Sequence, residues 1–159
     1  MAKPGSESMP SPMLCGVMGL LGVAAAAGAA DDPPPLAPAV VKAGRAVYQR
    51  ACASCHGARA EGAPNWEQPN DQGELPAPPH NTQGHTWRHS DAMLFGIIQH
   101  GWRDEFNKTQ RLSMPAFAGQ LSPKETVAVI AYLKTLWTRA QRRFQWEESR
   151  RQPFPPEAR

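Results

Sequence analysis

Cys52-Ala53-Ser54-Cys55-His56 is the stretch of this 159-residue sequence that decides the fold. It places two thiols three positions apart and an imidazole directly after the second thiol. A C-x-x-C pair also occurs in thioredoxin-like redox sites, which need a βαβ context, and in zinc sites, which need a second ligand pair at matching spacing. The sequence offers neither context, so the adjacent histidine is the feature that distinguishes the motif.

The C-x-x-C-H order is typical of covalent haem attachment. Cys52 and Cys55 add to the two haem vinyl groups as thioethers, and His56 is then held beneath the iron as an axial ligand. The chemistry therefore requires both the spacing and the order of these residues. We predict one covalent haem c, attached through Cys52 and Cys55, with its iron bound by His56.

The first 30 residues differ in composition from the rest of the chain. The apolar run over residues 13–30 ends in small residues and contains the A-x-A pattern Ala27-Gly28-Ala29. Such a segment is typical of a secretory signal peptide, so we expect cleavage after Ala29 or Ala30 and a periplasmic mature chain. An uncleaved N-terminal anchor is the alternative, because about 18 apolar residues are close to the minimum that spans a bilayer.

Composition limits the mature chain to one modest domain. The sequence contains 17 prolines and 13 glycines, and aromatic residues make up only 8%, so a core built from protein alone would be thin. A large buried cofactor would supply the missing apolar volume. The formal net charge of +3 is far from a nucleic-acid-binding profile, so no nucleic-acid partner is expected.

Helical periodicity and capping signals predict an all-α fold. We expect helices over 39–52, over 92–100 behind the N-cap signal Ser90-Asp91, and from the capping box Ser122-Pro123-Lys124-Glu125 onward. The last helix is expected to continue through Arg139 until Pro153 ends it. No strand pattern or repeat is present in the sequence.

Two long loops separate the expected helices. Residues 57–89 show neither a strand period nor a helical period and are rich in Pro, Gly, Asn and Gln. A loop of this length is unusual in a small domain unless it wraps a ligand. The second loop, over 102–121, contains Met114 followed by Pro115.

Taken together, these segments resemble the class I cytochromes c over about residues 41–137. Three pieces match the family in order, and they are Gly44, Tyr48 and Cys52 at intervals of four, Ser113-Met114-Pro115-Ala116-Phe117, and Val129-Ile130-Ala131-Tyr132-Leu133-Lys134. The stretch over 75–87, with Trp137 at the end of the last helix, is similar to an exported proteobacterial subgroup of monohaem cytochromes.

The resemblance implies a cytochrome c fold, in which the first and last helices pack against each other around one covalently attached haem. It implies that Gly44 and Tyr48 contact Val129 and Tyr132. It also implies that Met114 is the second axial ligand of the iron.

The chain then divides into four parts. Residues 1–30 are the signal peptide, 31–39 a proline-rich tether without fixed tertiary contacts, 40–138 the cytochrome c domain, and 139–159 a basic tail that is helical or disordered. The tail contains six arginines. A basic run of this kind is usually a solvated helix face. The alternative is that it docks an acidic partner protein or an anionic membrane.

Several further residues are candidates for the haem site. A carbonyl group of Pro78 or Pro79 is expected to accept a hydrogen bond from the far nitrogen of His56, with simple loop stiffening as the alternative. Trp87 and Arg111 are expected to line the haem edge and its carboxylates, with loop packing as the alternative.

Other methionine and histidine side chains compete for the same roles. Met93 lies on the apolar face of a helix, where methionine usually fills the core, so Met114 is the better candidate for the sixth ligand. His80 and His85 are expected either to contact a haem propionate or to be ordinary hydrogen-bonding residues of the loop. His89 and His100 are assigned no role in the site.

An iron with both axial positions filled by His and Met has no vacancy for a substrate, and thioether sulfur favours the reduced state. The expected function is therefore electron transfer between redox partner proteins, not enzymatic catalysis. Two alternatives stay open at this point. In the first, the chain is a haem subunit of a larger oxidoreductase. In the second, it is a peroxidase-like or gas-binding protein with a labile sixth ligand.

Overall fold

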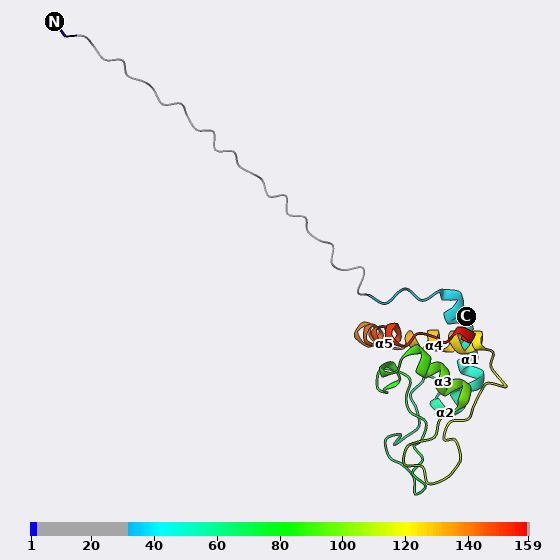
Figure 1. The fold of residues 1–159 in the computed structure, drawn as a ribbon. Helices are drawn as coiled ribbons and strands as arrows, with labels where there is room; N and C mark the ends of the chain where they lie inside the picture. The colour runs from blue at the N-terminus through cyan, green and yellow to red at the C-terminus, as the bar shows by residue number, and fades with distance from the viewer. Residues whose placement is uncertain (3–31, 159) are drawn as a thin grey trace. The chain divides into compact units, whose positions relative to one another are not determined.

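The computed structural model describes residues 1–2 and 32–158 (Figure 1). The apolar run and the cleavage site of the expected leader lie outside these residues. The helical elements are α1 (Pro38–Ala51), α2 (Ala53–His56), η1 (Thr86–Arg88), α3 (Asp91–His100), α4 (Pro123–Lys134), α5 (Arg139–Arg151) and η2 (Pro156–Ala158). In the described part of the chain, no helix is long and apolar enough to cross a membrane.

The described residues contain no strand, which agrees with the all-α prediction. Their only β-type pairing is an isolated antiparallel bridge between Trp102 and Met114. The predicted helix starts are confirmed, since the Ser90 hydroxyl accepts a hydrogen bond from the Met93 amide at 3.2 Å. Ser122 and Glu125 form the expected capping box at the start of α4.

The packing of α1 against α4 is the most extensive contact between helices. Gly44 makes it possible, because a Cβ atom at this position would overlap the backbone carbonyl of Ala128. Tyr48 is fully buried one turn later, with its ring centroid 5.3 Å from that of Tyr132. The expected contact with Tyr132 is confirmed, and the atoms closest to Gly44 belong to Ala128.

The last expected helix is in fact two helices. The chain does not continue as one helix through Arg139, because α4 ends at Lys134 and α5 begins after Thr138. Thr138 and Gln141 form a second capping box, in which the Thr138 hydroxyl accepts from the Gln141 amide at 3.2 Å. This T-x-x-Q signal is visible in the sequence and explains the new start.

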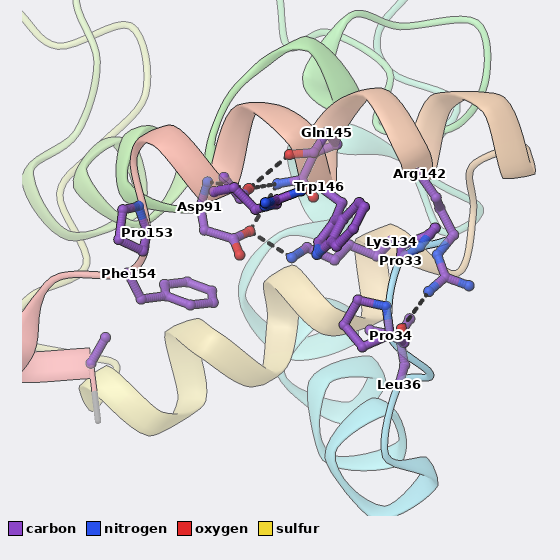
Figure 2. Close-up of a pocket in the computed structure, with 13 residues that line it drawn as sticks. Pro33, Pro34, Leu36, Asp91, Lys134, Arg142, Gln145, Trp146, Pro153 and Phe154 are labelled. Carbon is purple, nitrogen blue, oxygen red and sulfur yellow. Dashed lines mark hydrogen bonds and ion pairs between the residues drawn. The ribbon is translucent and has the colours of Figure 1, made fainter. Parts of the chain in front are cut away.

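The helix α5 is an integral part of the folded domain. Figure 2 shows Gln145 of α5 pointing toward Asp91, to which its amide nitrogen donates at 2.8 Å. The same carboxylate pairs with Lys134 of α4 at 2.6 Å. The Ser149 hydroxyl accepts a hydrogen bond from the Asp91 backbone at 3.0 Å. The basic tail is thus helical, but it joins α3 to α4 through a buried polar network.

The proline-rich tether also makes defined contacts, contrary to the expectation that it would have none. Arg139 pairs with Asp32. The Arg142 guanidinium donates to the Pro34 carbonyl at 3.1 Å (Figure 2). Between the tether and α5 lies a cleft of roughly 470 Å³. Arginine side chains of α5 hold the tether because they are long enough for their N–H groups to reach carboxylate and carbonyl oxygens at the surface.

Candidate functional site

The C-x-x-C-H motif lies where α1 ends and α2 begins. The Cys52 amide still donates to the Tyr48 carbonyl at 2.9 Å, and the His56 amide donates to the Cys52 carbonyl at 3.0 Å. Cys52 is partly buried and Cys55 is exposed, and neither forms a disulfide. Helical geometry therefore brings both thiols and the imidazole together within one short turn.

The Cys52 thiol does not have the properties of a nucleophilic redox cysteine. Burial raises the pKa of Cys52 to about 11. Reactive cysteines of the thioredoxin type have a lowered pKa, because the thiolate is the nucleophile. A protonated, half-buried thiol next to an exposed one fits residues that serve as attachment points.

The His56 ring is oriented by Pro78. Its Nδ1 atom lies 2.8 Å from the Pro78 carbonyl oxygen. A carbonyl can only accept, so Nδ1 carries the proton and Nε2 keeps its lone pair. The side chain is buried, and this burial lowers the pKa of His56, although the bond to Pro78 opposes the effect. The imidazole is therefore neutral, with one nitrogen left to bind a metal.

The first loop folds back over His56 through its backbone. The Gly62 amide donates to the His56 carbonyl, and the Ala63 amide donates to the Ala77 carbonyl, both at 2.8 Å. Gly62 adopts φ 76°, and a Cβ atom at this position would collide with the Pro78-Pro79 peptide. Glycine at 62 thus lets the two proline residues close over the imidazole. Sequence reasoning did not identify this role.

His80 lies against His56, a contact that the sequence did not predict, and its expected contact with a haem propionate stays a prediction. Its ring stacks on the His56 ring with centroids 4.0 Å apart and an interplanar angle of 29°. Its Nδ1 atom lies 2.8 Å from the Thr86 hydroxyl. Burial lowers the pKa of His80 well below its usual range, so this ring is also neutral.

Met114 lies in a loop that the backbone fixes on both sides. It exchanges two hydrogen bonds of 3.0 Å with Trp102, and the Phe117 amide donates to the Ile98 carbonyl at 3.0 Å. The Met114 side chain is partly buried and packs against the hydrophobic core. The competing Met93 lies in α3 and is also partly buried.

Polar contacts tie the two long loops to each other, and Figure 1 shows both extending from the helices on the same side. The Leu75 amide donates to Asp104 at 2.8 Å. Glu74 accepts two hydrogen bonds from Arg111, at 2.9 and 3.0 Å, and one from Thr109 at 3.1 Å. The Arg111 guanidinium is thus paired with Glu74. Its expected contact with the haem stays a prediction.

Aromatic residues of the first loop pack at some distance from the cysteine pair in sequence. The Trp87 indole donates to the Gly84 carbonyl at 2.9 Å and meets Phe144 of α5 edge to face. His85 stacks on Trp66 and meets the edge of His89. Contact of Trp87 with the haem edge remains a prediction, as does a propionate contact of His85.

The donor set fits a covalently attached haem. Two thiols free of any disulfide lie three positions apart in the sequence, and the adjacent His56 presents a neutral imidazole whose Nε2 has no hydrogen-bond partner among the described residues. The cleft between the tether and α5 is lined by none of these residues. The candidate residues for binding haem therefore lie at the end of α1 and in the two loops.

Comparison with known proteins points in the same direction. Residues 41–137 match the family model described as cytochrome c. Over 121 residues the chain is 32% identical to the Cbb3-type cytochrome c oxidase subunit FixP of Bradyrhizobium sp. (strain ORS 278). That match covers 75% of this chain and 38% of the relative, so the chain spans well under half of the relative's length.

The chain also matches a solved structure. It is cytochrome cL from the marine methylotrophic bacterium Methylophaga aminisulfidivorans, with a TM-score of 0.47 and 22% sequence identity. The match covers 75% of this chain and 68% of that protein.

Proposed function

Because the chain belongs to the cytochrome c family, we propose that it is a monohaem electron carrier whose iron is bound by His56 and Met114. Haem-based electron transfer follows from the family itself. The ligand pair, the single haem and the role as a carrier rather than an enzyme are our own additions.

The observation that carries this proposal is the state of His56. The imidazole follows directly on the second cysteine, is buried, and is tied through Nδ1 to the Pro78 carbonyl. Metal-binding histidines commonly donate their second ring N–H to a carbonyl or carboxylate, which fixes the ring and raises its basicity. The rest of the site is arranged around this ring.

The residues of the chain then have separate tasks. Cys52 and Cys55 would hold the cofactor, and His56 and Met114 would bind its iron. When bound, haem supplies a one-electron couple between ferric and ferrous iron. The packed α1–α4 pair and the hydrogen-bonded loops keep the ligands in place, so that a change in iron charge causes little rearrangement. A filled coordination sphere leaves no vacancy for a substrate.

The proposed location is the periplasm, where a protein exported by a signal peptide meets redox partner proteins. Donor and acceptor are proposed to be other redox proteins, which dock near the haem edge.

Removal of both attachment residues tests the central part of the proposal. The chain is produced in a host with a cytochrome c maturation system, as wild type and as Cys52→Ala/Cys55→Ala. We expect haem staining on a denaturing gel for the wild type and none for the double variant. Equal staining of both proteins would disprove covalent attachment through these residues. Mass spectrometry of the wild type gives the number of haem groups.

A second candidate function is supported by the similarity to FixP, which is named as a subunit of a Cbb3-type cytochrome c oxidase. The chain would then be a haem subunit of a larger oxidoreductase. Purification from the native membrane and periplasmic fractions distinguishes the two functions. A stable complex with a second redox enzyme at high salt supports the subunit, and a monomeric haem protein in the periplasmic fraction supports the carrier.

A further inference from the structure

His80 contacts the proposed iron ligand in a way that the attachment motif does not require. Its ring faces the His56 ring with centroids 4.0 Å apart and planes inclined by 29°. Both rings of the stack are imidazoles, so attraction between opposite charges does not explain the contact. Tyr48 lies at the edge of His80, with centroids 6.5 Å apart.

The His80 ring is itself held by several hydrogen bonds. The Thr86 hydroxyl directs its proton to the Pro79 carbonyl at 3.4 Å, so it accepts the Nδ1–H of His80 at 2.8 Å. The backbone of His80 is fixed as well, because its carbonyl accepts from the Trp137 indole at 2.8 Å. Its amide donates to the Ala60 carbonyl at 2.9 Å. The ring therefore has a fixed position before any cofactor is considered.

The hydrogen bond to Pro78 alone leaves one motion of His56 unrestrained. It determines where Nδ1 points, but the ring plane can still rock about the line between Nδ1 and the carbonyl oxygen. A flat ring in van der Waals contact with one face blocks this rocking. The orientation of an axial imidazole plane above the haem determines how the iron d orbitals split in the ferric state.

We propose that His80 is a positioning residue, whose stacked ring fixes the plane of His56 and thereby tunes the iron. This proposal rests on the proposed function, because it requires His56 to be an axial ligand. A simple core residue would need only volume at this place, whereas His80 presents a flat face to His56 and a donor to Thr86.

The test compares two replacements of His80 in the holoprotein. His80→Leu keeps apolar volume but removes the flat ring, whereas His80→Phe keeps a flat ring without the Nδ1 donor. We expect His80→Leu to shift the ferric EPR g-values, the spread of the haem methyl signals in paramagnetic NMR and the reduction potential. His80→Phe should lie between His80→Leu and wild type. His100→Leu, which removes an exposed histidine at the end of α3, is the matched control and should leave all three unchanged.

A third variant decides the question if the His80 variants do not fold. Thr86→Val is nearly isosteric and removes the acceptor of the His80 Nδ1–H, together with the longer hydrogen bond from the Thr86 hydroxyl to the Pro79 carbonyl. We expect it to shift the g-values in the same direction as His80→Leu, by a smaller amount. Wild-type g-values in Thr86→Val and in every folded His80 variant would overturn the proposal. A wild-type protein whose spectrum shows no histidine ligand, or one unchanged by His56→Ala, would instead overturn the proposed function.

Discussion

At the scale of single residues, the protein controls its site through backbone carbonyl groups. The Pro78 carbonyl fixes the His56 tautomer, and the Met114 carbonyl and amide are both paired with Trp102. Pro78 is followed by a second proline, whose nitrogen carries no hydrogen. No amide donor at this place near the imidazole therefore needs a partner. Each of the two proposed ligands thus has at least one main-chain partner.

Replacement of Met114 separates the carrier from an enzyme. We expect Met114→Ala to open the sixth coordination site, to lower the reduction potential because the thioether is lost, and to allow carbon monoxide and peroxide to reach the iron. Absorption spectra with and without carbon monoxide, together with a redox titration, measure these changes. Wild type should bind carbon monoxide slowly or not at all.

Met93→Ala is the matched control for this substitution. Met93 is only partly buried in α3, so its truncation should cost less than about 2 kcal/mol of unfolding free energy and leave the spectrum unchanged. If wild type binds carbon monoxide rapidly and Met114→Ala alters neither spectrum nor potential, the iron has no Met114 ligand. A protein with a labile sixth site would then replace the carrier.

At the scale of elements, two contacts between segments position the residues of the site. The crossing of α1 and α4 positions the start of the C-x-x-C-H motif, and the polar contacts between the loops position Met114. The crossing is close because Gly44 has no side chain to separate the helices at Ala128. The loops contain no regular secondary structure around Glu74 and Arg111, and hydrogen bonds of side chains, to other side chains and to the backbone, join them instead.

Gly44→Ala should disrupt the crossing of α1 and α4. The added Cβ atom would overlap the backbone carbonyl of Ala128, which cannot rotate away inside a helix. We expect a loss of about 3 kcal/mol or more in the free energy of unfolding, measured by denaturant titration. Gly96→Ala in α3 is the control, since nothing lies within 4 Å of its Cβ position, and it should gain up to about 1 kcal/mol. Similar effects of both substitutions would contradict the close crossing.

Acid should loosen the contact between the loops. The Asn70 amide, followed by Arg111 and Thr109, holds the pKa of Glu74 below its usual value near 4.5. The stabilisation is therefore complete above that value and is lost as the pH falls through the lowered pKa. We expect carbon monoxide to bind faster only in this acidic range in wild type, and already at pH 7 in Glu74→Gln.

Glu105→Gln is the control for the acidic transition, because Glu105 is exposed on the second loop. It should bind carbon monoxide at the wild-type rate across the same pH range. A rate in Glu74→Gln equal to that of wild type at pH 7 would show that the loops hold Met114 without this carboxylate.

At the scale of the whole molecule, segments on both sides of the matched family region pack onto it. The tether before residue 41 and α5 after residue 137 contact each other and enclose the Asp91–Lys134 pair. Arginines of α5 pair with carboxylates of the same chain, which include Glu147 and Glu148. Docking of the tail to an acidic partner or an anionic membrane remains a prediction, and these internal pairs compete with it.

The Asp91–Lys134 pair should contribute far more to the stability of the fold than the exposed pair of Asp32 with Arg139. Both side chains are largely buried, 16% exposed for Lys134 and 12% for Asp91, so removal of the carboxylate leaves a buried ammonium group without its partner. We expect Asp91→Ala to cost about 3 kcal/mol, measured by thermal or denaturant unfolding. Asp32→Ala removes an exposed pair with Arg139 and should leave the melting temperature nearly unchanged. Equal losses would mean that α5 does not bury the pair.

The sequence by itself determined the features that depend on local order. The spacing of Cys52, Cys55 and His56, the capping boxes and the helical periodicity are local, because capping and helix formation involve neighbours within about four residues. Met114 was selected by its place before Pro115 and by the family resemblance. The second capping box at Thr138 was also local, and the apolar continuation beyond Lys134 concealed it.

Only the tertiary structure decided which distant residues meet. The choice of Pro78 over Pro79 as acceptor, the stack of His80 on His56 and the pairing of Glu74 with Arg111 join positions tens of residues apart in loops without a period. The contacts of the tether with α5 are of the same kind. No periodicity encodes such pairs, because they form only when the backbone of both segments is already fixed by the packed helices.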